Sequence, residues 1–315
     1  MQFSLRGIRL FALATALVLT GSLHAAEVDQ YLPNNSEVVV SINVAQLMGS
    51  QLGKKYFAGA FEQMLKENAQ AQAVLKEVGL DPTKDVTRVT WAATTALPDS
   101  GLVIVSGKFN REKIAAIAAK AAADQKDKIK IHTNGGQTIY ETLDDSQKST
   151  FLAFASDSAM ILSPVRELVS DALANSKVGQ PSKELAALIA KGDAKQSAWL
   201  AALPLVLAKV PVDDPKQKAA MKNVEGITGA LTVDTDARLE LSLLTKDAQS
   251  ATVLQKMIGD FVNLGKLFVP TDKPDLAPVV DLLNSIRTAA KARSVSLTAQ
   301  MTGSQIEKAV KQLPK

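Results

Sequence analysis

Short turn sequences join pairs of strand patterns at three places, and these turns constrain the fold more than any other feature. Residues 134–136 (NGG) separate the strand patterns 128–133 and 137–143, while 156–158 (SDS) and 234–236 (DTD) play the same part elsewhere. Asn and Gly accept the positive φ that tight hairpins need. Connections this short join only antiparallel strands, so we expect an α+β fold of mainly antiparallel sheets and capped amphipathic helices rather than a doubly wound α/β fold.

A strand pattern, a helix cap and an amphipathic helix follow one another repeatedly along the chain. The β-branched run 37–43 ends at Asn43, a residue type favoured at helix N-caps, and apolar residues at helical spacing follow it. Breaks are expected at residues 49–50 and near Asn68. Gly79 is expected to end this helical region in the left-handed conformation.

Four further helix starts are predicted from capping residues. They are Asn110 before a helix from Arg111, Ser163 with Pro164 in the first turn, Asp247 before a helix through Val262, and Ser304. Ser304 and Glu307 form an S-x-x-E pattern, which predicts a capping box at the last helix.

The chain also contains a faint internal repeat. Residues 86–124 and 224–262 both have the pattern of a hairpin followed by a helix, and each is preceded by a strand and helix. The polar stretch 175–182 (NSKVGQPS) has the composition of a linker. The sequence therefore predicts two α+β halves, 27–178 and 179–315, whose shared pattern is consistent with a common origin, with one continuous domain as the alternative.

Residues 1–26 have the pattern of a Sec-type signal peptide. Two arginines precede the uncharged apolar run 10–20 (LFALATALVLT), and small residues end at Ala25 and Ala26. The run is shorter than the ~20 residues that span a bilayer, so we expect cleavage near Ala25 or Ala26 rather than an anchor. We expect the mature chain to be periplasmic or secreted, without a transmembrane segment.

Composition excludes several classes of site and partner. The chain has no cysteine, which removes disulfides, thiolate nucleophiles and cysteine metal sites. Removing the two arginines of the signal lowers the formal net charge from +4 to +2. A mature chain this close to neutrality lacks the basic footprint of a nucleic-acid-binding protein, so no nucleic acid partner is expected.

The usual catalytic motifs are missing from the sequence. There is no G-x-S-x-G and no S-x-x-K motif, and residues 101–108 lack the spacing and the Ser or Thr of a phosphate-binding loop. His132 is the one histidine beyond residue 26, and strand alternation predicts that it faces solvent beside Lys128 and Lys130. We therefore expect no catalytic residue, no cofactor-binding residue, no cofactor and no metal ligand.

Carboxylates remain the possible catalytic groups. Asp144 and Asp145, Asp213 and Asp214, and Asp234 with Asp236 form three clusters. All three lie in predicted turns, where Asp commonly bonds the local backbone, so we interpret them as turn residues. The two tryptophans, Trp91 and Trp199, lie in predicted strands and are expected in the core.

One basic stretch stands out in the first half. Between residues 108 and 130, cationic side chains outnumber the three acids Glu112, Asp124 and Asp127. The cations are Lys108, Arg111, Lys113, Lys120, Lys126, Lys128 and Lys130. This stretch could contact an anionic envelope polymer or lipid headgroup, and the alternative is a solvated helix face and hairpin edge.

Three segments resemble an uncharacterised family of exported bacterial proteins found in planctomycete-type genomes. These are residues 31–44 (YLPNNSEVVVSINV), 78–90 (VGLDPTKDVTRVT) and 151–173 (FLAFASDSAMILSPVRELVSDAL). They are strand, cap and hairpin patterns. The resemblance implies an exported α+β protein and supplies no activity.

The sequence favours an exported soluble protein of unknown function that acts by binding rather than by catalysis. Its expected partner is another protein or a polymer of the cell envelope or the medium. The alternative is a carboxylate-dependent hydrolase acting on an envelope polymer.

Overall fold

The computed structural model describes residues 26–94, 100–125, 127–134, 136–144, 146–175, 181–209, 211–270 and 276–312. Nearly all of the predicted signal peptide, most of the predicted linker, and Lys126 and Asp145 lie outside these ranges. Within them, no helix is long and apolar enough to cross a membrane.

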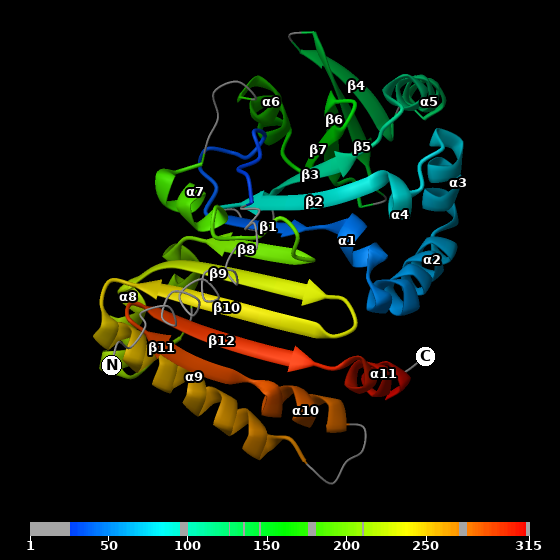
Figure 1. The fold of residues 1–315 in the computed structure, drawn as a ribbon. Helices are drawn as coiled ribbons and strands as arrows, with labels where there is room; N and C mark the ends of the chain where they lie inside the picture. Colours follow the sequence, from blue (N-terminus) through cyan, green and yellow to red (C-terminus); the bar gives the residue numbers. More distant parts are fainter. Residues whose placement is uncertain are drawn as a thin grey trace, which may run out of the picture.

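Twelve strands within the described residues form a single sheet (Figure 1). The strands are β1 (Val38–Ile42), β2 (Val86–Ala93), β3 (Leu102–Gly107), β4 (Ile129–Asn134), β5 (Gln137–Leu143), β6 (Ser149–Ser156), β7 (Ala159–Ser163), β8 (Ala198–Ala202), β9 (Val224–Val233), β10 (Ala237–Thr245), β11 (Arg287–Lys291) and β12 (Ser294–Met301). Their order is β11-β12-β10-β9-β8-β1-β2-β3-β7-β6-β5-β4, and every neighbouring pair is antiparallel. The predicted α+β class is therefore confirmed.

Helices flank both faces and one end of this sheet. They are α1 (Val44–Gly49), a π-helical turn (Gly53–Phe57), α2 (Ala58–Glu67), α3 (Ala69–Val78), α4 (Pro82–Asp85), α5 (Arg111–Asp124), α6 (Arg166–Asn175), α7 (Lys183–Ile189), a 3₁₀ helix (Pro204–Lys209), α8 (Pro215–Lys222), α9 (Ala248–Phe268), α10 (Ala277–Ser285) and α11 (Gly303–Gln312).

The pairing of β1 with β8 joins the two halves of the chain. Outward from this pair the order is β1-β2-β3-β7-β6 on one side and β8-β9-β10-β12-β11 on the other, with the β4–β5 hairpin added beyond β6. The registers of the two halves also correspond. Counted outward from the Val40–Leu200 pair of β1 and β8, the first half continues through Trp91 and Val103. The second half continues in the same way through Gly229 and Leu241. The two halves thus share a topology inside one continuous sheet. Their origin by duplication stays a prediction.

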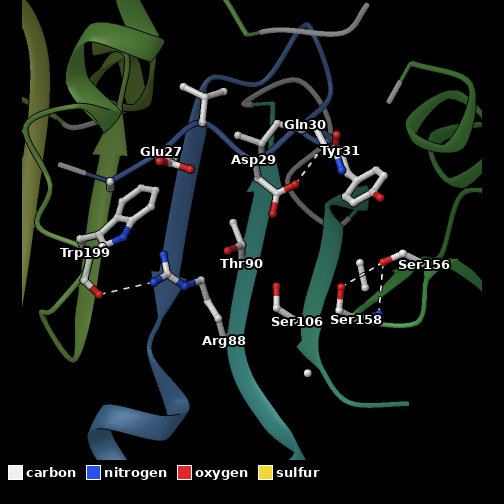
Figure 2. A pocket seen from close by; sticks show the side chains of 16 residues that line it. Glu27, Asp29, Gln30, Tyr31, Arg88, Thr90, Ser106, Ser156, Ser158 and Trp199 are labelled. Atoms are coloured by element: carbon white, nitrogen blue, oxygen red, sulfur yellow. Dashed lines mark hydrogen bonds between the residues drawn. The ribbon is translucent and has the colours of Figure 1, made fainter. Parts of the chain in front are cut away.

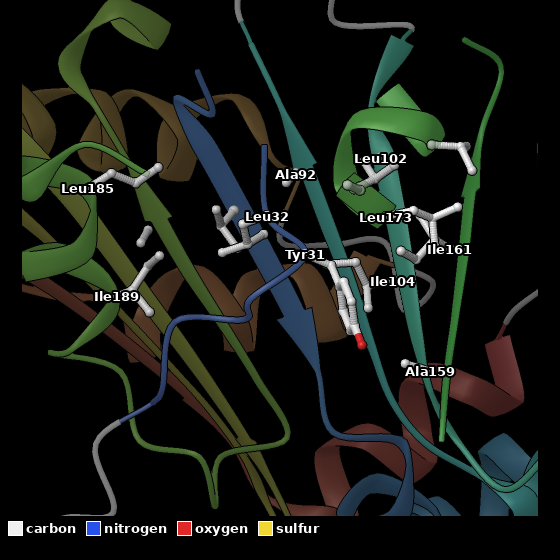
Figure 3. Close-up of a cluster of buried hydrophobic side chains, with 14 of the residues drawn as sticks. Tyr31, Leu32, Ala92, Leu102, Ile104, Ala159, Ile161, Leu173, Leu185 and Ile189 are labelled. Carbon is white, nitrogen blue, oxygen red and sulfur yellow. The ribbon is translucent and has the colours of Figure 1, made fainter. Parts of the chain in front are cut away.

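The hydrophobic core is divided between the two faces of the sheet. Face A, which carries Val39, Thr90 and Ile104, is covered by α6 and the N-terminal segment, residues 26–36, in the first half, and by α7 over β8 and β9 (Figure 3). Face B, which carries Leu200 and Val295, is covered in the second half by α8, α9 and the 3₁₀ helix. Side chains alternate between the faces of a strand, and the central strands β1 and β8 contribute to both clusters, through Val39 and Ala201 on face A and through Val38 and Leu200 on face B.

The predicted hairpins and most of the predicted caps are present. The side chain of Asn43 accepts the N–H of Gln46 at the start of α1, and Asn110 and Asp247 cap α5 and α9 in the same way. Gly79 has a φ of 74°, as expected for a left-handed C-cap. The N–H of the following Leu80 donates to the carbonyl of Leu75, 2.9 Å away.

Two predicted helix limits were wrong. α9 continues past Val262 to Phe268: Gly265 lies within the helix without adopting the positive φ of a C-cap, and the helix ends shortly before Pro270. α6 begins at Arg166 rather than directly after Pro164. The hydroxyl of Ser163 still accepts the N–H of Val165, so this serine closes a turn ahead of the helix.

The capping box of α11 lies two residues before its predicted position. Thr302 and Gln305 bond reciprocally: the N–H of Gln305 donates to the Thr302 hydroxyl oxygen, and the N–H of Thr302 donates to the Gln305 side-chain oxygen. The β9–β10 turn sets this start, because the carboxylate of Asp236 accepts the N–H of Gly303. Glu307 instead pairs with Lys55, 2.7 Å away.

His132 was predicted to be exposed, and the structure corrects this. Its Nε2 lies 2.7 Å from a carboxylate oxygen of Glu141, and its side chain is only 25% exposed. Its ring also lies beside that of Phe151. Strand alternation correctly places Ile131 and His132 on opposite faces of β4, but the faces are reversed with respect to solvent. Ile131 is 40% exposed, whereas His132 pairs with the buried Ile139 and shares its face.

We expect Thr302→Ala to lower the free energy of unfolding by about 1 kcal/mol, because it removes the helix cap. Ser304→Ala is the matched control and should change it by less than about 0.5 kcal/mol. Urea unfolding of both variants at pH 7 measures the difference. A larger loss for Ser304→Ala would contradict the assigned cap.

The contact of Glu141 predicts a pH dependence of stability. Hydrogen bonds from His132 and then from Ser149 lower the pKa of the Glu141 carboxyl below its usual 4.5. A lowered pKa stabilises the folded protein above the pKa of the unfolded chain, and this contribution disappears as pH falls through the folded value.

We therefore expect Glu141→Gln to destabilise the protein by about 1 kcal/mol at pH 7 and progressively less below about pH 4.5. Unfolding by urea across pH 3 to 7 measures this difference. Glu62→Gln on α2 serves as an exposed control whose effect should stay near zero. A destabilisation by Glu141→Gln that persists unchanged at pH 3 would refute the ionic contribution.

Candidate functional site

A cavity of about 940 Å³ lies on face A between the sheet and the N-terminal segment (Figure 2). Its wall combines charged, hydroxyl and aromatic groups. The lining residues are Ala26, Glu27, Val28, Asp29, Gln30, Tyr31, Leu32, Arg88, Thr90, Ser106, Gly107, Ser156, Ser158, Ala159, Ala194 and Trp199. A cavity of this size is in the range that holds small ligands.

The N-terminal segment forms one wall because it is anchored at both ends. The backbone N–H of Ala26 donates to the carbonyl of Gly192, 2.8 Å away. Further along, Leu32 is only 1% exposed and packs in the core cluster of face A (Figure 3). Between these anchors Asp29 forms a turn, in which its carboxylate accepts the N–H of Tyr31.

The sheet supplies the opposite wall through residues on one face of two neighbouring strands. Arg88 and Thr90 are two positions apart on β2 and therefore share a face, and Ser106 on β3 pairs with Arg88. The Thr90 hydroxyl lies 3.0 Å from that of Ser41 on β1. In the described part of the chain, the Ser106 hydroxyl has no hydrogen-bond partner.

Arg88 brings a half-buried positive charge into this cavity. Its guanidinium makes one hydrogen bond within the described residues, a long one of 3.4 Å to the carbonyl of Ala194. It forms no ion pair with any described carboxylate. Because a guanidinium has five N–H donors, most of its donors remain available.

Asp29 is the less exposed of the two acids that line the cavity. Burial raises the pKa of its carboxyl, while the N–H of Tyr31 and the charge of Arg88 act in the opposite direction. Desolvation disfavours the charged form of a carboxyl, and for Asp29 it outweighs the hydrogen bond from Tyr31 and the charge of Arg88.

Trp199 closes the cavity on the β8 side. It is 5% exposed, and its indole Nε1 has no hydrogen-bond partner in the described ranges. Figure 2 shows the nitrogen-bearing edge of the ring turned toward Arg88. An unpaired buried donor is costly, so this N–H is a place where an acceptor would add stability.

Two serines of the β6–β7 turn form the remaining edge. The hydroxyl oxygens of Ser156 and Ser158 lie 3.2 Å apart, and the N–H of Ser158 donates to the Ser156 hydroxyl. Both turn residues line the cavity, and Ser158 is exposed, so this turn forms part of the rim.

The acidic clusters found in the sequence lie in separate turns, away from this cavity. Asp144 accepts the N–H groups of Ser146 and Lys148, and Asp214 caps α8. Asp236 binds the start of α11. These contacts agree with their interpretation as turn residues. Among the residues that the structure describes, no group of three or more His, Asp or Glu side chains could hold a metal ion.

The basic stretch lies on α5 and β4, and its described members do not line the cavity. Arg111 contacts the carboxylate of Asp157 at 3.4 Å, with both side chains exposed. This agrees with a solvated helix face. Both tryptophans lie in strands as predicted; Trp199 is buried but also lines the cavity, and Trp91 is half-buried rather than fully in the core.

Sequence reasoning missed Arg88, Asp29 and the role of the N-terminal segment. One signal was present in the strand pattern VTRVTWAA, where Arg88 alternates in phase with Thr90 and Ala92. Both of those residues are buried, so a charged residue in phase with them marks an inward-facing polar position. No local signal indicates that residues 26–32 fold back over the sheet.

The chain was also compared with known proteins. Neither the scan against protein-family models nor the search of curated proteins found a match. The residues of the cavity therefore carry the functional argument.

Proposed function

We propose that this chain is an exported, non-enzymatic binding protein of the cell envelope or medium, and that the cavity beneath the N-terminal segment is its ligand site. The observation that carries the proposal is the half-buried Arg88, which faces the cavity without an ion-pair partner among the described residues. A charged side chain that is partly removed from water and lines a cavity without an ion-pair partner can bind a ligand of opposite charge.

The arrangement of acids supports binding over the alternative of a carboxylate-dependent hydrolase. Such a hydrolase needs two carboxyls that flank the substrate. The acids that line the cavity, Glu27 and Asp29, both belong to the N-terminal segment. The facing wall on β2 and β3 contributes Arg88, Thr90 and Ser106, which are suited to holding a ligand.

The volume of the cavity limits what it can enclose. About 940 Å³ accommodates a small molecule or the end of a chain, but not a folded partner. We therefore propose that the ligand is a small envelope metabolite, or a terminus or side group of an envelope protein or polymer.

Of the two predicted cleavage sites, the packing of Ala26 favours the one after Ala25. Ala26 is 4% exposed, and a Cβ built at Gly192 would lie only 3.4 Å from the Ala26 Cβ and 3.3 Å from Trp199. A small residue at position 26 therefore fits beside Gly192. Cleavage after Ala25 retains this packing and leaves an α-ammonium that can donate to the Gly192 carbonyl, whereas cleavage after Ala26 removes both.

We expect the mature protein to begin at Ala26. Secretion of the full chain by a bacterial host and intact mass measurement would test this, and a retained leader would contradict export. Separately, a purified chain that starts at Glu27 should have a free energy of unfolding about 1 kcal/mol lower than a chain that starts at Ala26, because it lacks the hydrogen bond of Ala26 to Gly192. Equal stability would remove the argument for this cleavage site.

We expect a bulky side chain at the cavity rim to abolish ligand binding. Mature protein, Ser158→Trp and the control Ser146→Trp are each incubated with fractions of envelope extract and medium. Native mass spectrometry then identifies bound compounds. Ser146 is matched because it is also an exposed turn serine but lies outside the cavity.

A compound retained by the mature protein and Ser146→Trp, but lost by Ser158→Trp, supports the proposal. Equal binding by all three proteins would show that the compound binds outside this cavity. Conversion of an envelope polymer by the mature protein, lost in Asp29→Asn, would favour the hydrolase.

A further inference from the structure

We propose that the cavity recognises a carboxylate group of its ligand, held by the guanidinium of Arg88 and the indole N–H of Trp199. This inference rests on the proposed function, because it assigns the chemical class of ligand to the same cavity. The ligand class is a small organic acid or the carboxyl terminus of a short peptide that also carries a hydrogen-bond donor.

The first argument comes from the geometry of Arg88. A guanidinium presents parallel N–H pairs that match the two oxygens of a carboxylate. Within the described residues Arg88 makes one hydrogen bond, 3.4 Å long, to the carbonyl of Ala194, and Asp29 interacts with its charge without forming an ion pair. An anion from outside the chain can therefore supply both the missing charge and the missing acceptors.

Trp199 provides the second, independent argument. Its indole can donate one hydrogen bond and accept none, and that donor is buried without a partner in the described ranges. The nitrogen edge faces the Arg88 side of the cavity (Figure 2). A carboxylate bound by Arg88 would bring acceptor oxygens toward this edge. Because the indole nitrogen itself is buried, the side chains that cover it must shift slightly for a ligand oxygen to reach it.

The charges on the other wall limit which anion fits. Asp29 and Glu27 line the same cavity, so a dianion would face two carboxyls with a single guanidinium to hold it. A planar monoanion is the better match. The Asp29 carboxyl, buried and bonded to the N–H of Tyr31, can accept a further donor such as an ammonium or hydroxyl.

The two tryptophans of the chain, Trp91 and Trp199, allow a direct readout. In a ¹H–¹⁵N spectrum of the mature protein, Trp91→Phe assigns the indole N–H signal of Trp199. The protein is titrated to ~10 mM with Ala-Ala, N-acetyl-Ala-Ala, Ala-Ala amide and inorganic phosphate, a range that detects millimolar affinity. Peptides with a free carboxylate should shift the Trp199 signal in a saturable way, and the amide should not.

Substitution of Arg88 completes the test. Arg88→Gln should weaken peptide binding at least about tenfold, and Arg88→Lys should weaken it as well because it lacks the planar fork. Arg293→Gln is the control, since the exposed guanidinium of Arg293 lies 3.6 Å from the carboxylate of Glu225 and outside the cavity. Chemical-shift dispersion reports whether each variant folds, and the lysine variant serves if the glutamine variant does not.

Three results would overturn the inference, and they differ in what they leave standing. Equal shifts with the amide, or binding unaffected at Arg88, would exclude carboxylate recognition while still locating a ligand beside Trp199. A shift with phosphate alone would indicate that the cavity recognises a phosphoryl group rather than a carboxylate. No shift with any probe would overturn the assignment, and the rim variant Ser158→Trp would then decide the proposed function by itself.

Discussion

The antiparallel pairing of β1 with β8 is the interaction on which the rest of the structure depends. It joins two halves that would otherwise be separate sheets. Its register also sets the cavity, because Ser41 on β1 pairs with Trp199 on one side and with Thr90 on the other. The indole from the second half and the polar residues of β2 from the first half thereby lie on the same face, on opposite sides of one strand.

The N-terminal segment converts this open sheet face into an enclosed site. Its anchors are a backbone hydrogen bond at Ala26 and the buried side chain of Leu32. Between them Asp29 turns the chain, so the same residues that cover the core also place an acid opposite Arg88. Stability and the shape of the site are therefore coupled, and loss of this segment would expose apolar surface while opening the cavity.

Local signals predicted the local structure well, and they failed where distant contacts choose between alternatives. Hairpin turns and the caps at Asn43, Asn110 and Asp247 follow from a few neighbouring residues. At α11 two overlapping capping patterns fit, and the contact of Gly303 with Asp236 selected the earlier one. For His132, alternation defined two faces of β4 but not which face the rest of the fold would cover.

The same limit explains why the candidate site could not be read from the sequence. Arg88 is an inward-facing cation in a strand whose neighbours on that face, Thr90 and Ala92, are buried. Such a position opposes the pattern that builds the core, and it persists in a fold only when something compensates the desolvated charge. Within the described chain the compensation is incomplete, since Arg88 has one long hydrogen bond and Trp199 an unpaired N–H. Under the proposal, an acceptor that arrives from outside the chain satisfies both of these donors.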